Sequence, residues 1–203
     1  MLEFYPAFPV NTNLNQIGVY TVQKAFGLHE VNKIVRLVKD YEYSDALILK
    51  DEDGTKTEEV RKSRIKWLPP EAEKTEWIYE RLMGIALDVN YEYWKFNLHH
   101  VQDSIQYTEY EADYSGHYDW HMDLGPHPIS HRKISIIVQL SDPSEYEGGE
   151  VEINNGIFEK PFVASKFKGD VTIFPSYLMH RVKPVTSGFR KSLVLWVGGA
   201  TFR

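Results

Sequence analysis

The spacing of apolar residues changes along the chain, from helical in the first half to alternating in the second. Between residues 28 and 41 apolar side chains recur every three or four positions, which predicts a helix that Gly27 can cap. A second helix is predicted to start at the proline pair Pro69-Pro70 and to end near Asn90. An alternating stretch at residues 17–26 predicts one strand ahead of both helices.

From residue 91 onward, short alternating runs are separated by glycine, proline and asparagine turns. About eight such runs predict a closed or double-sheet antiparallel architecture. Because the helices come first, we expect a mainly β (α+β) fold, a double-stranded β-helix (jelly-roll) barrel with N-terminal flanking helices, whose interior can hold one small ligand. The expected strands are 94–100, 104–110, 117–123, 133–141, 149–154, 157–164, 169–174, 180–185 and 189–198.

Length and composition predict a single domain over residues 1–203, in which residues 1–95 give helical support and residues 96–203 form the jelly-roll core. The charged stretch 50–59 is too polar for a core and predicts an exposed hairpin or mobile loop. The net charge of −6 makes nucleic acid a disfavoured partner. The absence of cysteine excludes disulfides and thiolate zinc sites. Without a long apolar run, we expect a cytoplasmic protein with no membrane contact.

Two histidines and one carboxylate are the candidate metal ligands. His121 and Asp123 form a His-x-Asp pair whose spacing puts both side chains on one strand face, and His180 follows far downstream. This set is the 2-His-1-carboxylate facial triad, which suits Fe(II) or Mn(II) better than structural zinc. His117 and Asp119 form a second such pair with the same parity, so spacing alone leaves both pairs open.

Arg190 is the candidate anion-binding residue. Strand alternation places Arg190, Ser192, Val194 and Trp196 on one face, which we expect to be the interior. A buried guanidinium needs an anion, and a carboxylate can meet it through two parallel hydrogen bonds. An arginine on the solvated rim of the barrel is the alternative.

These residues resemble the prolyl 4-hydroxylase-like branch of Fe(II)/2-oxoglutarate-dependent dioxygenases, especially the bacterial hydroxylases called PKHD-type. The family element Gly-x-Tyr-x-x-His-x-Asp stands at 116–123, a Gly-Gly-Glu turn stands at 148–150, and the distal histidine precedes a basic residue. The resemblance is specific over about residues 100–200 and looser over 1–95. It favours His121 and Asp123 over the earlier pair.

The resemblance implies that His121, Asp123 and His180 bind Fe(II), and that Arg190 binds the distal carboxylate of 2-oxoglutarate. Many relatives have a tyrosine where this chain has Gln139, so an amide contact or Ser192 is expected to replace the hydroxyl contact. The remaining residues expected to line the co-substrate pocket are Tyr110, Tyr118, Val151, Val182 and Trp196. Tyr118 can face the pocket together with His121 only if a bulge interrupts the strand.

The resemblance also implies the reaction: O2 and 2-oxoglutarate are consumed, succinate and CO2 are released, and an unactivated C–H bond is hydroxylated. The expected substrate is a prolyl or other residue of a protein or peptide, over which the stretch 50–64 would close as a lid with Arg61 and Arg64 near the entrance. A solvated hairpin is an equally good interpretation of that stretch. The alternatives are a hydroxylase of a free amino acid or small molecule, and a non-catalytic cupin-like metal-binding module. A nucleic-acid demethylase is disfavoured, because Trp196 stands where such enzymes carry a second arginine.

Overall fold

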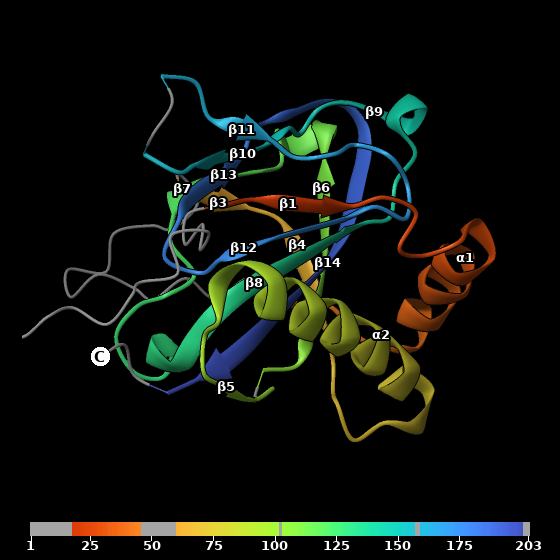
Figure 1. Cartoon of the computed structure of the whole chain (residues 1–203). Helices are drawn as coiled ribbons and strands as arrows, with labels where there is room; N and C mark the ends of the chain where they lie inside the picture. The colour runs from red at the N-terminus through yellow and green to blue at the C-terminus, as the bar shows by residue number, and fades with distance from the viewer. Residues whose placement is uncertain (1–17, 46–59, 102, 157–158, 201–203) are drawn as a thin grey trace, which may run out of the picture.

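Two antiparallel sheets and two helices make up the computed structural model, which describes residues 18–45, 60–101, 103–156 and 159–200 (Figure 1). The larger sheet has the strand order β1 (Tyr20–Val22), β12 (Val171–Pro175), β8 (Arg132–Gln139), β14 (Val185–Gly199), β6 (Ile105–Glu111), β4 (Arg64–Leu68) and β2 (Ser44–Asp45), and β5 (Leu98–His100) and β9 (Tyr146–Gly148) also pair with β14. The smaller sheet has the order β11 (Phe162–Val163), β10 (Val151–Asn154), β13 (Met179–Val182), β7 (His117–His121) and β3 (Arg61–Lys62). Short helical turns lie at η1 (Val38–Asp40), η3 (Asn90–Trp94), η4 (Ala112–Tyr114), η5 (Ile129–His131) and η6 (Pro143–Glu145).

The predicted mainly β jelly-roll with N-terminal helices is confirmed. The two sheets stack as a sandwich and do not close into a continuous barrel. Each expected strand from residue 104 onward has a counterpart, although β11 is reduced to Phe162–Val163. The strand expected at 94–100 shrinks to β5, because the chain is still helical up to Trp94 in η3.

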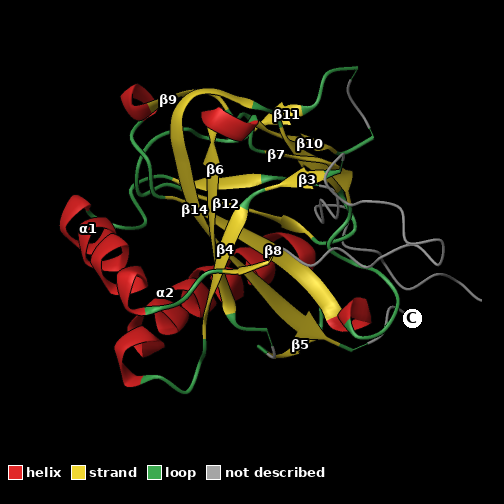
Figure 2. Ribbon diagram, turned by 180° about the vertical axis from the view of Figure 1, so that it is seen from behind, coloured by secondary structure: helices red, strands yellow, loops and turns green. Residues whose placement is uncertain are grey.

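The two helices cover the outer face of the larger sheet (Figure 1, Figure 2). Helix α1 (Leu28–Leu37) begins at the predicted cap Gly27, whose backbone N–H donates to Glu30 Oε2 at 2.8 Å. Helix α2 (Glu73–Val89) begins three residues after the proline pair rather than at it. The reason is a turn: Ala72 N–H donates to Pro69 O, and the Thr75 hydroxyl donates to the same carbonyl at 2.7 Å.

The long strand β14 separates two apolar clusters because its side chains alternate. Leu193, Leu195 and Val197 point into the cluster beneath the helices. On the other face, Val194 packs against the cluster that lies between the two sheets, next to Arg190 and Trp196 in the wall of a cavity. Because side chains alternate along β14, the apolar residues of one face pack under the helices, and the polar residue Arg190 on the other face points toward the space between the two sheets.

The stretch 50–64 is only partly described. Residues 50–59 lie outside the described residues, whereas Arg61 belongs to β3 and Arg64 opens β4. Arg61 and Arg64, at the end of the stretch that was expected to form a lid, thus lie in strands that pair with β7 and with β6. Within the part of the chain that is described, no helix is long and apolar enough to cross a membrane.

Candidate metal centre and co-substrate pocket

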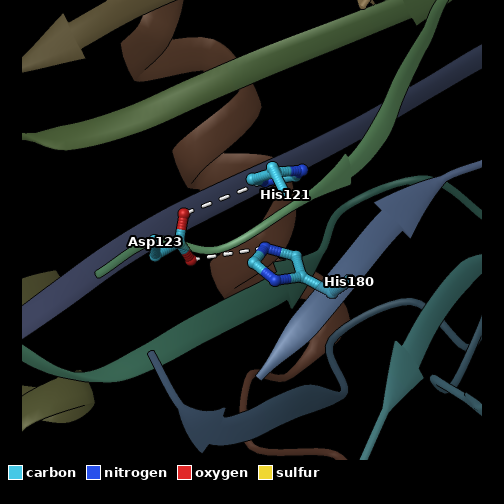
Figure 3. Close-up of side chains that lie close together, drawn as sticks. All are labelled: His121, Asp123 and His180. Atoms are coloured by element: carbon cyan, nitrogen blue, oxygen red, sulfur yellow. Dashed lines mark ion pairs between the residues drawn. The ribbon is translucent and has the colours of Figure 1, made fainter. Parts of the chain in front are cut away.

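The side chains of His121, Asp123 and His180 lie close together in the smaller sheet (Figure 3). His121 is on β7, Asp123 follows that strand, and His180 is on β13. Their nearest ligand atoms all lie within 4.8 Å of one another. Asp123 Oδ1 is 3.9 Å from His121 Nε2, and Asp123 Oδ2 is 3.3 Å from His180 Nε2. The register places His180 of β13 directly opposite His121 of β7, so two segments 59 residues apart meet by strand pairing. One ion could contact all three groups.

The backbone fixes both imidazoles with the same nitrogen toward Asp123. His121 Nδ1 lies 2.7 Å from Asp119 O, and His180 Nδ1 lies 2.9 Å from Leu178 O. A carbonyl can only accept, so each neutral ring donates from Nδ1 and keeps the lone pair of Nε2 for a metal. Two such nitrogens and one carboxylate, without thiolate, form the donor set of a non-haem Fe(II) site.

Asp123 is oriented by a serine pair that the sequence did not reveal. Ser135 Oγ donates to Asp123 Oδ2 at 2.6 Å and lies 2.9 Å from Ser176 Oγ. Ser135 projects from β8 of the larger sheet, so it joins the metal centre to the opposite layer of the sandwich. Nothing in the sequence pattern marks a serine inside an apolar strand as a partner of a residue twelve positions earlier.

Burial and mutual proximity shift the pKa values of the three groups. Burial, reinforced by the neighbouring His180, lowers the pKa of His121 to about 3. Burial opposes the charge of Asp123, but His180, His121 and the Ser135 hydrogen bond together lower the pKa of its carboxyl. Burial also opposes the charge of His180, and the adjacent Asp123 carboxylate outweighs it and raises the pKa of that imidazole. The carboxylate is therefore ionised, as a metal ligand must be.

A bulge in β7 distinguishes the two His-x-Asp pairs. Between the register pairs His180–His121 and Val182–Tyr118, β13 advances two residues while β7 advances three. Tyr118 thus lies on the same side as His121, and the two rings stack with centroids 3.5 Å apart. This is the bulge that the resemblance required. His117 is outside the three-residue cluster, and its Nδ1 bonds to Ser115 O at 2.8 Å.

The other histidines stay away from the centre. His29, His99 and His127 are exposed, and the side chain of His100 lies outside the described residues. His131 is half-buried, with Nε2 3.3 Å from Asp103 Oδ2.

A cavity of about 560 Å³ opens from the metal centre between the two sheets. Arg190 lies in its wall, only 3% exposed, and its Nη1 is 3.4 Å from Ser192 Oγ. Within the described residues, no carboxylate lies at ion-pairing distance from Arg190. Gly149 (φ +61°) leaves room for the arginine, because a Cβ there would lie 3.1 Å from Arg190 Cδ. The guanidinium of Arg190 is therefore buried without a carboxylate partner among the described residues, and Gly149 leaves space beside it. Such a group can bind the far carboxylate of 2-oxoglutarate.

The structure brings nearly all of the expected pocket residues together. Gln139 is the exception: its amide donates to Tyr146 Oη at 3.0 Å and to Ser141 O at 3.2 Å, and it does not line the cavity. Ser192, directly opposite Gln139 in register, does line the cavity. The expected residues found in the cavity wall are His121, Asp123, His180, Arg190, Tyr110, Tyr118, Val151, Val182, Ser192 and Trp196.

The two arginines expected at the entrance have different surroundings. Arg61 lines the cavity and is 9% exposed. Arg64 is half-exposed outside the cavity and pairs with Glu111 at 3.1 Å and with Glu109 at 3.6 Å. Arg61 lies on β3 of the smaller sheet, whereas Arg64 lies on β4 of the larger sheet, three positions before Trp67 and therefore on the strand face opposite to the one that lines the cavity. Lining residues that the sequence did not indicate include Trp67, Gln106, Met122 and Arg132.

Comparisons with known proteins agree with this site. Residues 105–198 match the sequence profile of the 2OG-Fe(II) oxygenase superfamily. A PKHD-type hydroxylase of Synechococcus sp. (strain JA-2-3B'a(2-13)) is 27% identical over 181 residues, 88% of this chain and 77% of that protein. A PKHD-type hydroxylase of Colwellia psychrerythraea is 37% identical over 90 residues, 43% of this chain and 40% of that protein.

Solved structures share the fold at low sequence identity. A Pseudomonas putida prolyl-4-hydroxylase superposes with a TM-score of 0.70 at 19% identity, covering 90% of this chain and 93% of that one. A Trichoplax adhaerens prolyl hydroxylase, solved in complex with a peptide fragment of the hypoxia inducible factor oxygen degradation domain, gives a TM-score of 0.72 at 15% identity and covers 93% and 85%.

Residues 105–198, which match the 2OG-Fe(II) oxygenase superfamily, hold the metal centre and most of the pocket. The predicted enzyme class, a 2-oxoglutarate-dependent dioxygenase similar to prolyl hydroxylases, is thereby confirmed. The chain is also similar to the PKHD-type hydroxylases.

Proposed function

We propose that this enzyme hydroxylates an unactivated C–H bond of a prolyl or other residue in a protein or peptide, using O2 and releasing succinate and CO2. The observation that carries the proposal is that one cavity contains both a candidate metal site and a buried arginine that can bind a carboxylate. Two Nδ1-anchored imidazoles face a buried carboxylate, and a buried guanidinium without a carboxylate partner in the described chain lies in the same wall.

Each side chain then has a role set by its position. His121, Asp123 and His180 hold Fe(II), and Ser135 keeps the carboxylate of Asp123 oriented. Arg190 and Ser192 bind the distal carboxylate of 2-oxoglutarate, and the ring of Tyr110 lies 5.6 Å from the guanidinium carbon. The bound iron and 2-oxoglutarate supply the oxidising chemistry, while the protein supplies placement and a shielded cavity.

Apolar side chains around the cavity support a peptide substrate. Val151 and Val182 wall its inner part, while Trp67 (39% exposed) and Met122 (50% exposed) also reach solvent. Such half-exposed apolar groups suit contact with a chain longer than the reacting residue. The structural relatives named as prolyl hydroxylases, one of them bound to a peptide, support the same choice. We propose further that residues 1–203 act as one domain and that the enzyme works in the cytoplasm.

Anaerobic addition of Fe(II) and 2-oxoglutarate tests the centre directly. We expect a weak visible charge-transfer band from chelated co-substrate, and its absence in the wild-type protein would reject the proposal. His121→Ala and His180→Ala should lose the band and succinate formation. His117→Ala is the matched control and should keep both, because His117 lies outside the cluster. Loss of metal binding in His117→Ala would show that the earlier pair holds the ion.

Succinate release measured with peptides and with free amino acids separates the substrate classes. Hydroxylation of a free amino acid alone would favour the small-molecule alternative, which a cavity of about 560 Å³ also accommodates. Metal binding without any turnover would favour a non-catalytic cupin-like module.

A further inference from the structure

Arg61 is a buried cation that the proposed chemistry does not use. It is 9% exposed and lines the cavity that holds the metal centre. Its Nε donates to Ser63 Oγ at 2.8 Å, but its buried Nη2 has no hydrogen-bond partner. A buried donor left without an acceptor is costly, so an unpaired guanidinium inside a cavity indicates a missing anion.

Aromatic stacking fixes Arg61 close to the reacting centre. Its guanidinium carbon lies 4.7 Å from the centroid of the Tyr118 ring, and that ring stacks on His121 with centroids 3.5 Å apart. One aromatic ring therefore separates Arg61 from a metal ligand. An anion bound by Arg61 would lie beside the metal centre rather than at the outer surface of the protein.

Among the described residues that line the cavity, only Arg61 keeps an uncompensated charge if the proposed function holds. Arg132 is neutralised by Asp103 through two hydrogen bonds of 3.0 Å. The formal charges of a divalent metal ion, the Asp123 carboxylate, a dianionic co-substrate and the Arg190 guanidinium add up to zero. Asp123 is the only carboxylate among the described residues that line the cavity. Since the described part of the chain offers no further carboxylate in the cavity wall, we look to the substrate for the negative charge.

A second orphan donor lies in the same wall. Trp196 Nε1 is buried without a hydrogen-bond partner, and its ring is covered by Arg132 at 3.8 Å. Both free groups are donors, so the missing ligand must present acceptors. A carboxylate presents only acceptors and meets the planar guanidinium with matching geometry.

We propose that Arg61 binds a carboxylate side chain of the substrate, so that this hydroxylase selects acidic peptides. This inference rests on the proposed function and deepens it. It also explains a contrast: the whole chain carries a net charge of −6, whereas arginines outnumber acids in the cavity wall. An acidic peptide is repelled by the chain as a whole and attracted only at this cavity.

Two matched peptides test the selection, acetyl-Gly-Glu-Pro-Glu-Gly-amide and acetyl-Gly-Gln-Pro-Gln-Gly-amide. Each is titrated anaerobically into protein loaded with Fe(II) and 2-oxoglutarate, and binding is followed by the fluorescence of Trp67 and Trp196, which line the cavity. We expect the glutamate peptide to bind about tenfold or more tightly than the glutamine peptide, the usual effect of one charge-assisted hydrogen bond. Equal affinities, or no binding of either peptide, in the wild-type protein would overturn the inference.

Three variants assign the effect to the residue. Arg61→Gln should abolish the preference, and Arg61→Lys should restore part of it because the charge returns without the planar fork. Arg64→Gln is the matched control, since Arg64 lies outside the cavity and pairs with Glu111, and it should keep the preference. A preference that survives in Arg61→Gln would also refute the inference.

The charge-transfer band of the same samples separates this inference from the proposed function. A band in Arg61→Gln shows that the protein is folded and that the metal and co-substrate sites are intact. Lost peptide discrimination with the band retained supports the role of Arg61. If the band is missing in the wild-type protein, the proposed function fails, and with it the charge argument.

Discussion

At the scale of single residues, Ser135 is the group that orients the metal-binding carboxylate. Its hydroxyl donates to Asp123 Oδ2 at 2.6 Å from the opposite sheet. We predict that Ser135→Ala weakens metal affinity about 10- to 100-fold, the usual cost of removing an outer partner of a metal ligand. Titration with Fe(II) or Mn(II) under anaerobic conditions measures the change.

Ser141→Ala is the control for that prediction. Ser141 is also a buried serine, but it bonds to the backbone of Phe189 and Lys191 and does not line the cavity. Its loss should lower the unfolding temperature and leave metal affinity unchanged. Unchanged affinity in Ser135→Ala as well would mean that Asp123 is oriented by its backbone alone.

Gly149 is predicted to control co-substrate binding through the space beside Arg190. An added Cβ would lie 2.9 Å from Val185 Cγ2 and 3.1 Å from Arg190 Cδ. Gly149→Ala should therefore raise the KM for 2-oxoglutarate by about tenfold or more, since a displaced guanidinium loses its bidentate contact, with metal affinity nearly unchanged. Gly156→Ala separates crowding from backbone strain, because Gly156 also has a positive φ (+74°) but no atom within 4 Å of an added Cβ.

Some residues of the site could be read from the sequence, and others could not. His121, Asp123, His180 and Arg190 were predictable because their types and order are themselves a chemical signature. Ser135 and Gly149 were not assigned roles, because their roles come from contacts across the sandwich that no local pattern encodes. Gln139 was assigned to the pocket, but Tyr146 Oη accepts its amide instead.

At the scale of elements, Tyr79 ties helix α2 to the larger sheet. Its hydroxyl donates to Leu68 O of β4 at 2.6 Å and accepts from Ile105 N–H of β6 at 2.7 Å. Tyr79→Phe removes both contacts and leaves two buried backbone groups unpaired, so we predict a loss of about 1–3 kcal/mol in the free energy of unfolding. Chemical denaturation measures it. Tyr91→Phe, at a 74% exposed position, should change stability little; an equal loss in both variants would contradict the bridging role.

The elements show where periodicity succeeds and where it fails. Strong alternation located the two longest strands: the predicted strand 133–141 corresponds to β8, and the predicted strand 189–198 lies within β14, which begins four residues earlier at Val185. It missed β3 and β4, because Arg61 and Arg64 carry charges that are typical of a loop while their strands are held by pairing partners distant in sequence. The bulge in β7 also follows from pairing with β13, so strict alternation put Tyr118 on the wrong face until the family resemblance required otherwise.

At the scale of the whole molecule, the packing of the larger sheet keeps several phenols neutral. Burial raises the pKa of Tyr79 to about 12. Burial and a hydrogen bond to Glu109 likewise raise the pKa of Tyr43 to about 12, and they raise that of Tyr107 as well. These tyrosines lie on or beside β4 and β6, so the sandwich favours protonated phenols over a continuous region.

Stability should therefore fall in alkaline solution. In the unfolded chain these phenols ionise near pH 10, whereas in the folded protein Tyr79 and Tyr43 ionise near pH 12. A raised pKa contributes stability that is complete below about pH 10 and is lost as the pH rises toward about 12. Urea denaturation at about pH 9, 10 and 11 should show a decreasing free energy of unfolding, with a shallower decrease in Tyr79→Phe, which has one such phenol fewer. A slope that is unchanged by the substitution would place the alkaline sensitivity in groups other than Tyr79.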